Sequence, residues 1–190
     1  MTDDYGKILD SALSQKQQIL LRSDISNYED DCIEVICHLC ALKKNIVVIT
    51  FGGNTRDISE ILEYRKADIS RVYYIDAISI SQGKGTPPVK KVVTVYKPNS
   101  FEDINLYTMV FVRDLGIENT VVVFLSIHKL QEYENEDEIG FFLYYYTDQL
   151  KRLKVPKIIL THSGINYVLA QIISRNADIV IPVRKEKMVA

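Results

Sequence analysis

The chain has 190 residues, of which 47% are hydrophobic and 25% are charged, and its formal net charge is −2. A chain of this length buries roughly 70% of its unfolded surface, so it needs neither disulfides nor a structural metal to fold. The small net charge gives no overall attraction to nucleic acid or membrane, and no apolar run approaches the roughly 20 residues of a membrane span. We see no secretory leader and only three cysteines, close together, so we expect a cytoplasmic protein without a disulfide framework.

The order of predicted elements is that of an α/β protein. We expect one domain over residues 1–190, with an N-terminal helix within 1–17 and a basic tail at 184–190. Apolar, β-branched runs predict strands at 18–22, 46–50, 72–76, 92–96, 120–126, 157–161 and 178–183. Apolar stripes predict helices at 1–16, 32–43, 57–66, 136–154 and 166–175, and another that begins at Ser100 as its N-cap. Continuously apolar strands that alternate with helices predict a three-layer α/β/α fold with a mostly parallel sheet.

Two long stretches carry a family resemblance. VVITFGGNTRDISEILEYRKADISRVYYIDAIS and VVVFLSIHKLQEYENEDEIGFFLYYYTDQLKRLKVPKIILTH resemble the middle and the following part of RecA-like domains of the KaiC type. In that family one strand ends in Ile-Asp-Ala and a serine, and a later apolar strand ends in Asp-Ser. The resemblance covers residues 18 to 183 and implies a RecA-like core.

The chain departs from this family at the positions that handle ATP. The phosphate loop G-x-x-x-x-G-K-[ST] wraps phosphates with backbone N–H groups and meets their charge with a lysine, but residues 23–31 read SDISNYEDD. The resemblance places Phe51-Gly52-Gly53 where the catalytic glutamate belongs, and Leu125 where the metal-holding aspartate belongs. Leucine offers magnesium no oxygen. We therefore expect a pseudo-ATPase with a degenerate P-loop, no RecA-type ATP hydrolysis and no cofactor.

Ligands of doubly wound sheets bind at the carboxyl ends of the strands. The candidate ligand-binding residues there are Gly52, Gly53, Asn54, Thr55, Arg56, Asp76, His128 and His162. The turn GGNTR would present backbone amides and Arg56 to an anion, or it is a plain strand-to-helix turn capped by Asn54 or Thr55. The two histidines would join Asp76 in a metal or acid–base cluster, or they are simply exposed or hydrogen bonded.

Three further groups of residues have two interpretations each. Cys32, Cys37, His38 and Cys40 lie on one predicted helix, and we interpret the cysteines as core residues rather than zinc ligands. Lys84, Lys90 and Lys91 are candidate nucleic-acid-binding residues, or they belong to a solvated loop. The five aromatic residues at 141, 142, 144, 145 and 146 surround one predicted helix, and one buried face cannot cover them all. Phe141, Tyr144 and Tyr145 are therefore candidate interface residues, or the tyrosines lie along the surface with hydrated hydroxyls.

We expect a non-catalytic RecA/KaiC-like scaffold or regulatory subunit that acts by self-association or by docking onto a protein partner. One alternative is a nucleic-acid-binding module that uses the lysine-rich loop 83–91. Another is a small-ligand or nucleotide sensor, or an enzyme, at the carboxyl edge of the sheet. We expect no metal site and no membrane partner, and the fold alone does not decide among these functions.

Overall fold

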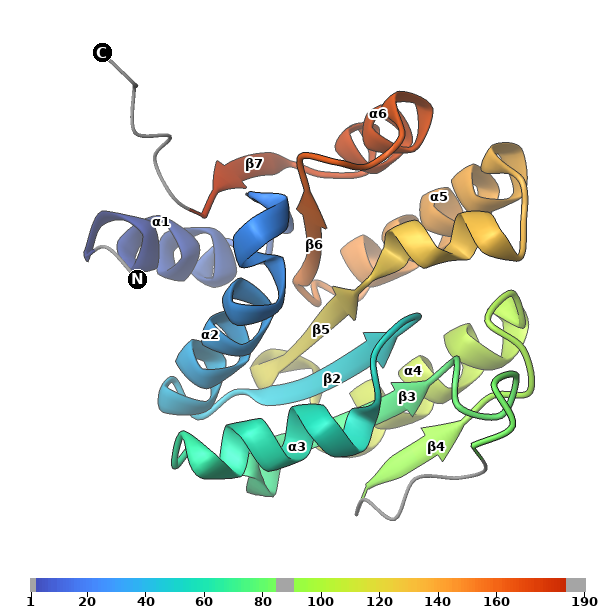
Figure 1. Cartoon of the computed structure of the whole chain (residues 1–190). Coiled ribbons are helices and arrows are strands. Elements are labelled where there is room, and N and C mark those ends of the chain that lie inside the picture. The colour runs from blue at the N-terminus through green and yellow to red at the C-terminus, as the bar shows by residue number, and fades with distance from the viewer. Residues whose placement is uncertain (1–2, 85–90, 184–190) are drawn as a thin grey trace.

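The computed structural model describes residues 3–84 and 91–183, and the seven strands in these ranges form one sheet in the order β4-β3-β2-β5-β6-β1-β7 (Figure 1). All strand pairs are parallel. The strands are β1 (Gln18–Ser23), β2 (Asn45–Thr50), β3 (Val72–Asp76), β4 (Val92–Thr94), β5 (Thr120–Leu125), β6 (Lys157–His162) and β7 (Ile179–Pro182). The helices are α1 (Asp3–Ser14), α2 (Tyr28–Ala41), α3 (Thr55–Tyr64), α4 (Phe101–Leu115), α5 (Glu136–Arg152) and α6 (Tyr167–Arg175). The predicted tail 184–190 and Lys90 lie outside the described residues.

Helices cover both faces of the sheet, which confirms the predicted three-layer architecture. Helices α1, α2 and α3 pack on one face, and α4, α5 and α6 pack on the other (Figure 1). Strand β5 lies near the middle of the sheet, and all six of its residues are buried. Its continuous run of Val, Phe and Leu is the pattern that two covered faces require. Within the described ranges, no helix is both long and apolar enough to cross a bilayer.

The register brings the carboxyl ends of the central strands to one edge of the sheet. Ser23 at the end of β1 pairs with His162 at the end of β6. Thr50 at the end of β2 pairs with Leu125 on one side and Asp76 on the other. The residues that follow these strands therefore surround a common space above the sheet.

The prediction of where α2 begins was wrong. Residues 23–31 are not only a turn, because a short 3₁₀ helix (Ile25–Asn27) leads directly into α2, which begins at Tyr28 rather than at residue 32. The three acids after Tyr28 occupy the first turn of α2, where the helix dipole favours negative charge. Ser100 does stand at the N-cap position of α4, but its side chain makes no capping hydrogen bond.

At the opposite edge of the sheet, β6 begins with a lysine inside the protein. The Lys157 side chain is fully buried, and its ammonium contacts the Thr147 hydroxyl and donates to the Asn176 carbonyl at 3.2 Å. Burial, aided by the nearby Lys151, lowers the pKa of Lys157 from 10.5 to about 7. Burial penalises the charged form of an amine, so this lysine costs stability whenever it is protonated.

Replacement of Lys157 by methionine should change how stability depends on pH. Between pH 7 and 10.5 the unfolded chain holds a proton that the folded chain has lost, so wild-type stability should rise with pH in this window. The slope should approach about 1.4 kcal/mol per pH unit. Urea unfolding across this window should show the slope reduced in Lys157→Met and retained in the exposed control Lys97→Met. Parallel curves for all three proteins would show that Lys157 is not neutralised by folding.

Candidate functional site

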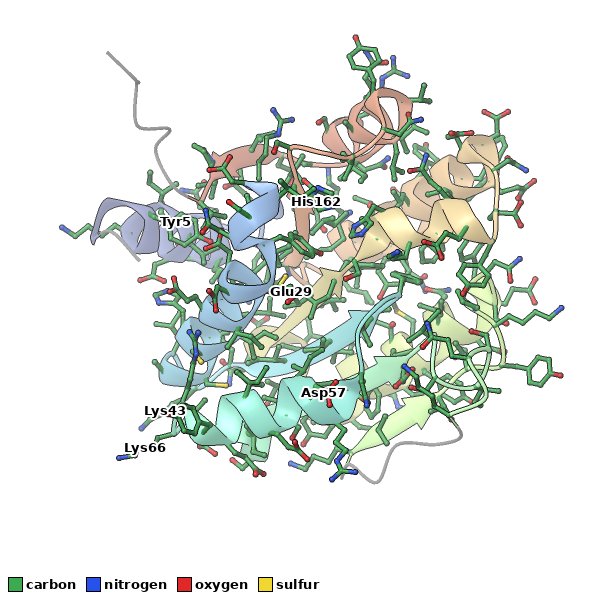
Figure 2. All side chains as sticks on the ribbon, viewed as in Figure 1. Tyr5, Glu29, Lys43, Asp57, Lys66 and His162 are labelled. Atoms are coloured by element: carbon green, nitrogen blue, oxygen red, sulfur yellow. The ribbon has the colours of Figure 1, made fainter. Side chains whose placement is uncertain are left out.

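A cavity of about 700 Å³ opens at the carboxyl edge of the sheet, between the starts of α2 and α3 and the ends of β5 and β6. Figure 2 labels Glu29 on α2, Asp57 on α3 and His162 on β6, three of the residues that line it. We call it the carboxyl-edge pocket. Its remaining lining residues are Ile25, Ser26, Tyr28, Asp30, Cys32, Ile33, Gly52, Gly53, Asn54, Ile58, Ile61, Leu125, Ser126, His128 and Lys129.

Tyr28 ties the wall of this pocket to two strands. Its side chain is buried, its hydroxyl accepts a 2.6 Å hydrogen bond from the Ser126 backbone N–H, and it donates to the Leu160 carbonyl at 3.3 Å. Burial raises the pKa of the Tyr28 phenol well above its ordinary value. The hydroxyl therefore stays protonated and serves as donor and acceptor at once. These two bonds fix the start of α2 over the ends of β5 and β6.

The structure brings together the two histidines that the sequence predicted to meet. The ring centroids of His128 and His162 are 4.6 Å apart, and both rings make edge contacts with the Tyr28 ring, at 5.8 and 5.1 Å. Burial and the neighbouring His162 lower the pKa of His128 to about 4, and burial also lowers the pKa of His162. Both imidazoles are therefore neutral at pH 7, where each nitrogen either donates or accepts one hydrogen bond.

The nitrogens of the two rings differ in their partners. The Nδ1 atom of His162 accepts a 3.1 Å hydrogen bond from the Gly164 backbone N–H. The Nδ1 atom of His128 is buried and has no hydrogen-bond partner among the residues that the structure describes. A buried polar atom without a partner costs free energy, so His128 is held in place by its surroundings at some expense of stability.

Charge around the pocket is mainly negative and its floor is apolar. Glu29, Asp30 and Asp57 are exposed carboxylates of the lining, and Asp30 is paired with Arg65 at 3.1 Å. Lys129 is the one lysine or arginine among the described residues that line the pocket. Lys129 is paired with Glu132 at 2.7 Å, which reduces its pull on an anion. The buried part of the lining is apolar or aromatic and comprises Tyr28, Cys32, Ile33 and Leu125.

The predicted GGNTR turn contributes to the pocket only in part. Gly52 and Gly53 line it, and a Cβ on Gly52 would lie 3.0 Å from Lys129 and 3.1 Å from Ser126, so only glycine fits without a shift. Asn54 caps α3 by accepting a hydrogen bond from the Arg56 N–H at 3.0 Å. Arg56 itself points away into an ion pair with Glu60 at 2.7 Å. Asn54 therefore caps the turn, as one of the two interpretations predicted, and also lines the pocket, whereas Arg56 is not among the lining residues.

Asp76 does not join the histidines, although a cluster of the three was one of the two interpretations of the sequence. Its carboxylate is buried and accepts hydrogen bonds from the Thr55 hydroxyl at 3.0 Å and from the backbone and hydroxyl of Ser79, each at 2.8 Å. Strand β2 stands between β3, which carries Asp76, and β5, which precedes His128. Asp76 and Thr55 therefore organise the loop after β3.

The other predicted clusters lie away from the pocket, apart from Cys32. The cysteines are free; Cys32 and Cys40 are buried and Cys37 is half-buried, while His38 bonds Asp10 at 2.7 Å. Among the residues that the structure describes, no three His, Cys, Asp or Glu side chains are placed to hold a metal ion.

The lysine-rich loop and α5 also lie elsewhere. Lys84 is exposed, and Lys91 lies over the Tyr73 ring with 4.6 Å from its ammonium to the ring centroid. The three predicted interface residues of α5 are all exposed: Phe141, Tyr144 and Tyr145.

The neutral state of His128 predicts a specific loss of stability in acid. A folded-state pKa of about 4, against 6.5 for an unperturbed histidine, contributes stability that is present above pH 6.5 and is lost as pH falls toward 4. We expect the unfolding midpoint in urea to fall less between pH 7 and pH 4.5 in His128→Gln than in the wild type. An NMR titration should find the His128 ring still neutral at pH 5.5; a ring that titrates at 6.5 would contradict this assignment.

Comparisons with known proteins support the fold. No family model and no curated protein matches the chain. Among solved structures, the KaiC-like protein PH0186 of Pyrococcus horikoshii superposes with a TM-score of 0.61 at 16% identity, over 88% of this chain and 71% of that one.

Two other Pyrococcus horikoshii structures are similar. The uncharacterized protein PH0321, solved in complex with an unknown peptide, gives a TM-score of 0.68 at 13% identity over 88% of this chain and 77% of that one. PH0250 gives 0.60 at 11% identity, over 95% of this chain and 88% of that one. Identities this low relate folds only. The chain is an α/β protein with the RecA-like fold of KaiC-like proteins.

Proposed function

We propose that this chain is a non-hydrolysing KaiC-like domain that binds a basic, apolar segment of a partner protein in the carboxyl-edge pocket, and so acts as a scaffold or regulatory subunit. The observation that carries the proposal is the lining of the pocket. Three carboxylates stand around an apolar floor at the edge where this class of fold binds its ligands.

The chemistry of the lining favours a cationic occupant over a nucleotide. A triphosphate would enter beside Glu29, Asp30 and Asp57, and the one lining lysine is already paired with Glu132. Residues 23–31, which follow β1, contain no glycine, lysine or arginine. Phosphoryl transfer depends on positioned cations around the phosphates, and these residues supply none.

A peptide segment fits the pocket in size and character. Cavities of about 300–1,000 Å³ bind ligands of the size of a few side chains, and this pocket measures about 700 Å³. Apolar groups of the segment would cover Ile33, Ile58 and Leu125, and its lysine or arginine side chains would meet the carboxylates at the rim. A peptide is also bound to PH0321, whose fold is similar.

Replacing Leu125 at the end of β5 by aspartate, the residue type that holds the metal in the family that the sequence resembles, should not create an ATPase. Leu125 is 3% exposed, and a carboxylate there lacks a cationic partner, so Leu125→Asp should lose about 3 kcal/mol or more of unfolding free energy. The volume-conserving control Leu125→Met should lose less than about 1.5 kcal/mol. Urea unfolding measures both, and a phosphate-release assay with Mg·ATP should stay at background for each. Full stability of Leu125→Asp, or phosphate release by it, would count against the proposal.

Binding of a basic peptide should depend on the acids of the pocket. We would use a fluorescent peptide of alternating arginine and leucine, with a glutamate–leucine peptide as the negative probe. The double variant Glu29→Lys/Asp57→Lys should weaken binding at least about tenfold, because two attractive charges become repulsive. Fluorescence anisotropy at low and moderate salt gives the dissociation constants.

The matched control is Glu102→Lys/Asp103→Lys, which makes the same charge change in the first turn of α4, outside the pocket. It should leave peptide affinity nearly unchanged, whereas an equal loss in both double variants would show that only net charge matters. Mg·ATP should not raise the melting temperature; stabilisation by ATP would favour a nucleotide in the pocket instead.

A further inference from the structure

Helix α5 carries an exposed aromatic stripe that the pocket does not use. Its Ile139, Phe142, Tyr146 and Leu150 face the core. On the opposite side, Phe141 is 59% exposed, Tyr144 61% and Tyr145 68%, and the two tyrosine rings touch edge to face at 5.4 Å. Exposed aromatics that adjoin one another are typical of protein interfaces.

The charges on the same helix are arranged symmetrically about these tyrosines. The first turn is acidic, with Asp137 and Glu138 exposed, and the last turn is basic, with Lys151 and Arg152 exposed. Glu138 and Arg152, one from each turn, lie equally far from Tyr145 along the helix. At 1.5 Å per residue, about 21 Å of helix separates Glu138 from Arg152.

We propose that α5 is a self-association surface on which two copies of this chain pair antiparallel about a twofold axis at Tyr144 and Tyr145. In such an isologous contact each surface patch meets its own copy. At 100° per residue, Glu138 and Arg152 lie on the same side of the stripe, so Glu138 of each copy faces Arg152 of the other. The tyrosines of the two copies pack at the centre.

Charge favours the antiparallel arrangement of the two α5 helices over a parallel one. Parallel helices would place acids against acids at one end and bases against bases at the other, and like charges across an interface are unfavourable. The antiparallel pair matches both ends and opposes the two helix dipoles.

Existing ion pairs within the chain leave the required groups available. Lys151 is held by Asp178 at 2.6 Å, so it contributes less to a partner. Arg152 donates only its Nε to Asp148, at 2.8 Å, and its side chain is 78% exposed. The other guanidinium N–H groups can therefore bind a carboxylate of the second copy. None of the pocket residues takes part, so the inference stands apart from the proposed function.

Two charge-reversal variants test the proposal. Each variant alone should not dimerise, and an equimolar mixture of the two should. In a pair of Glu138→Arg chains, the new arginine of each copy faces Arg152 of the other, and in a pair of Arg152→Glu chains the new glutamate faces Glu138, so each variant should repel its own copy. An equimolar mixture restores Glu–Arg contact at both ends, so it should form a heterodimer. Light scattering over a concentration series should give twice the chain mass of 21.8 kDa for the wild type and the mixture, and the single chain mass for each variant alone.

The central tyrosine is tested with a matched control. Tyr145→Ser should raise the dimer dissociation constant at least about tenfold, as expected for an aromatic at the centre of an interface. Tyr64→Ser, at an exposed tyrosine of α3, should leave it unchanged. A wild type that stays monomeric at every soluble concentration overturns the proposal, and so does a dimer that survives all three α5 substitutions. Circular dichroism and restoration in the mixture distinguish loss of association from loss of folding.

Discussion

The architecture of the carboxyl edge depends on the Tyr28 phenol. A parallel sheet leaves backbone groups at its strand ends that need partners, and here one hydroxyl serves both β5 and β6, at Ser126 and Leu160. The phenol can do this because burial keeps it protonated. Its ring also packs against His128 and His162, so one side chain sets the start of α2, the turn after β5 and the inner wall of the pocket.

This use of a tyrosine follows from what the chain after β1 contains. In folds that bind phosphates, a glycine-rich loop at the start of the first helix presents backbone N–H groups to the anion. Here the helix begins with a large aromatic residue and three acids. The aromatic ring fills space with apolar contacts. Glu29 and Asp30 interact with the helix dipole from the exposed side, whereas Asp31 is buried and bonded to the Ser23 hydroxyl. The same position in the fold thus becomes an apolar pocket with a negative rim.

The sequence predicted the layers and most elements, because these depend on local pattern. Strand β5 was predictable because its continuous run of β-branched and apolar residues is typical of a strand that is covered on both faces, and all six of its residues are buried. The start of α2 was not, because SDISNYEDD has the composition of a turn, and only the burial of Tyr28 shows where the helix begins. Partners 98 and 132 residues away hold that tyrosine, and no local pattern encodes such distances.

Contacts of the site were predicted correctly for residues that follow adjacent strands. They were predicted wrongly for residues whose strands are separated in the sheet order. His128 and His162 meet because β5 and β6 are neighbours. Asp76 was expected beside them because it also ends a strand, but β2 separates its strand from β5. Residues 23–31 were recognised only as a degenerate phosphate loop. That Asp57 on α3 adds to Glu29 and Asp30 on α2 depends on tertiary packing.

The two proposed surfaces lie on different sides of the sheet, and this gives them a joint consequence. The pocket is formed by α2, α3 and the strand ends, whereas the stripe on α5 belongs to the other helical layer (Figure 1). Pairing through α5 would therefore leave both pockets of a dimer open. Two pockets held at a fixed separation bind a partner with two basic segments more tightly than one pocket does, because the second contact is intramolecular. A weak individual pocket would then suffice for a scaffold, and loss of the α5 contact would lower partner affinity without any change in the pocket.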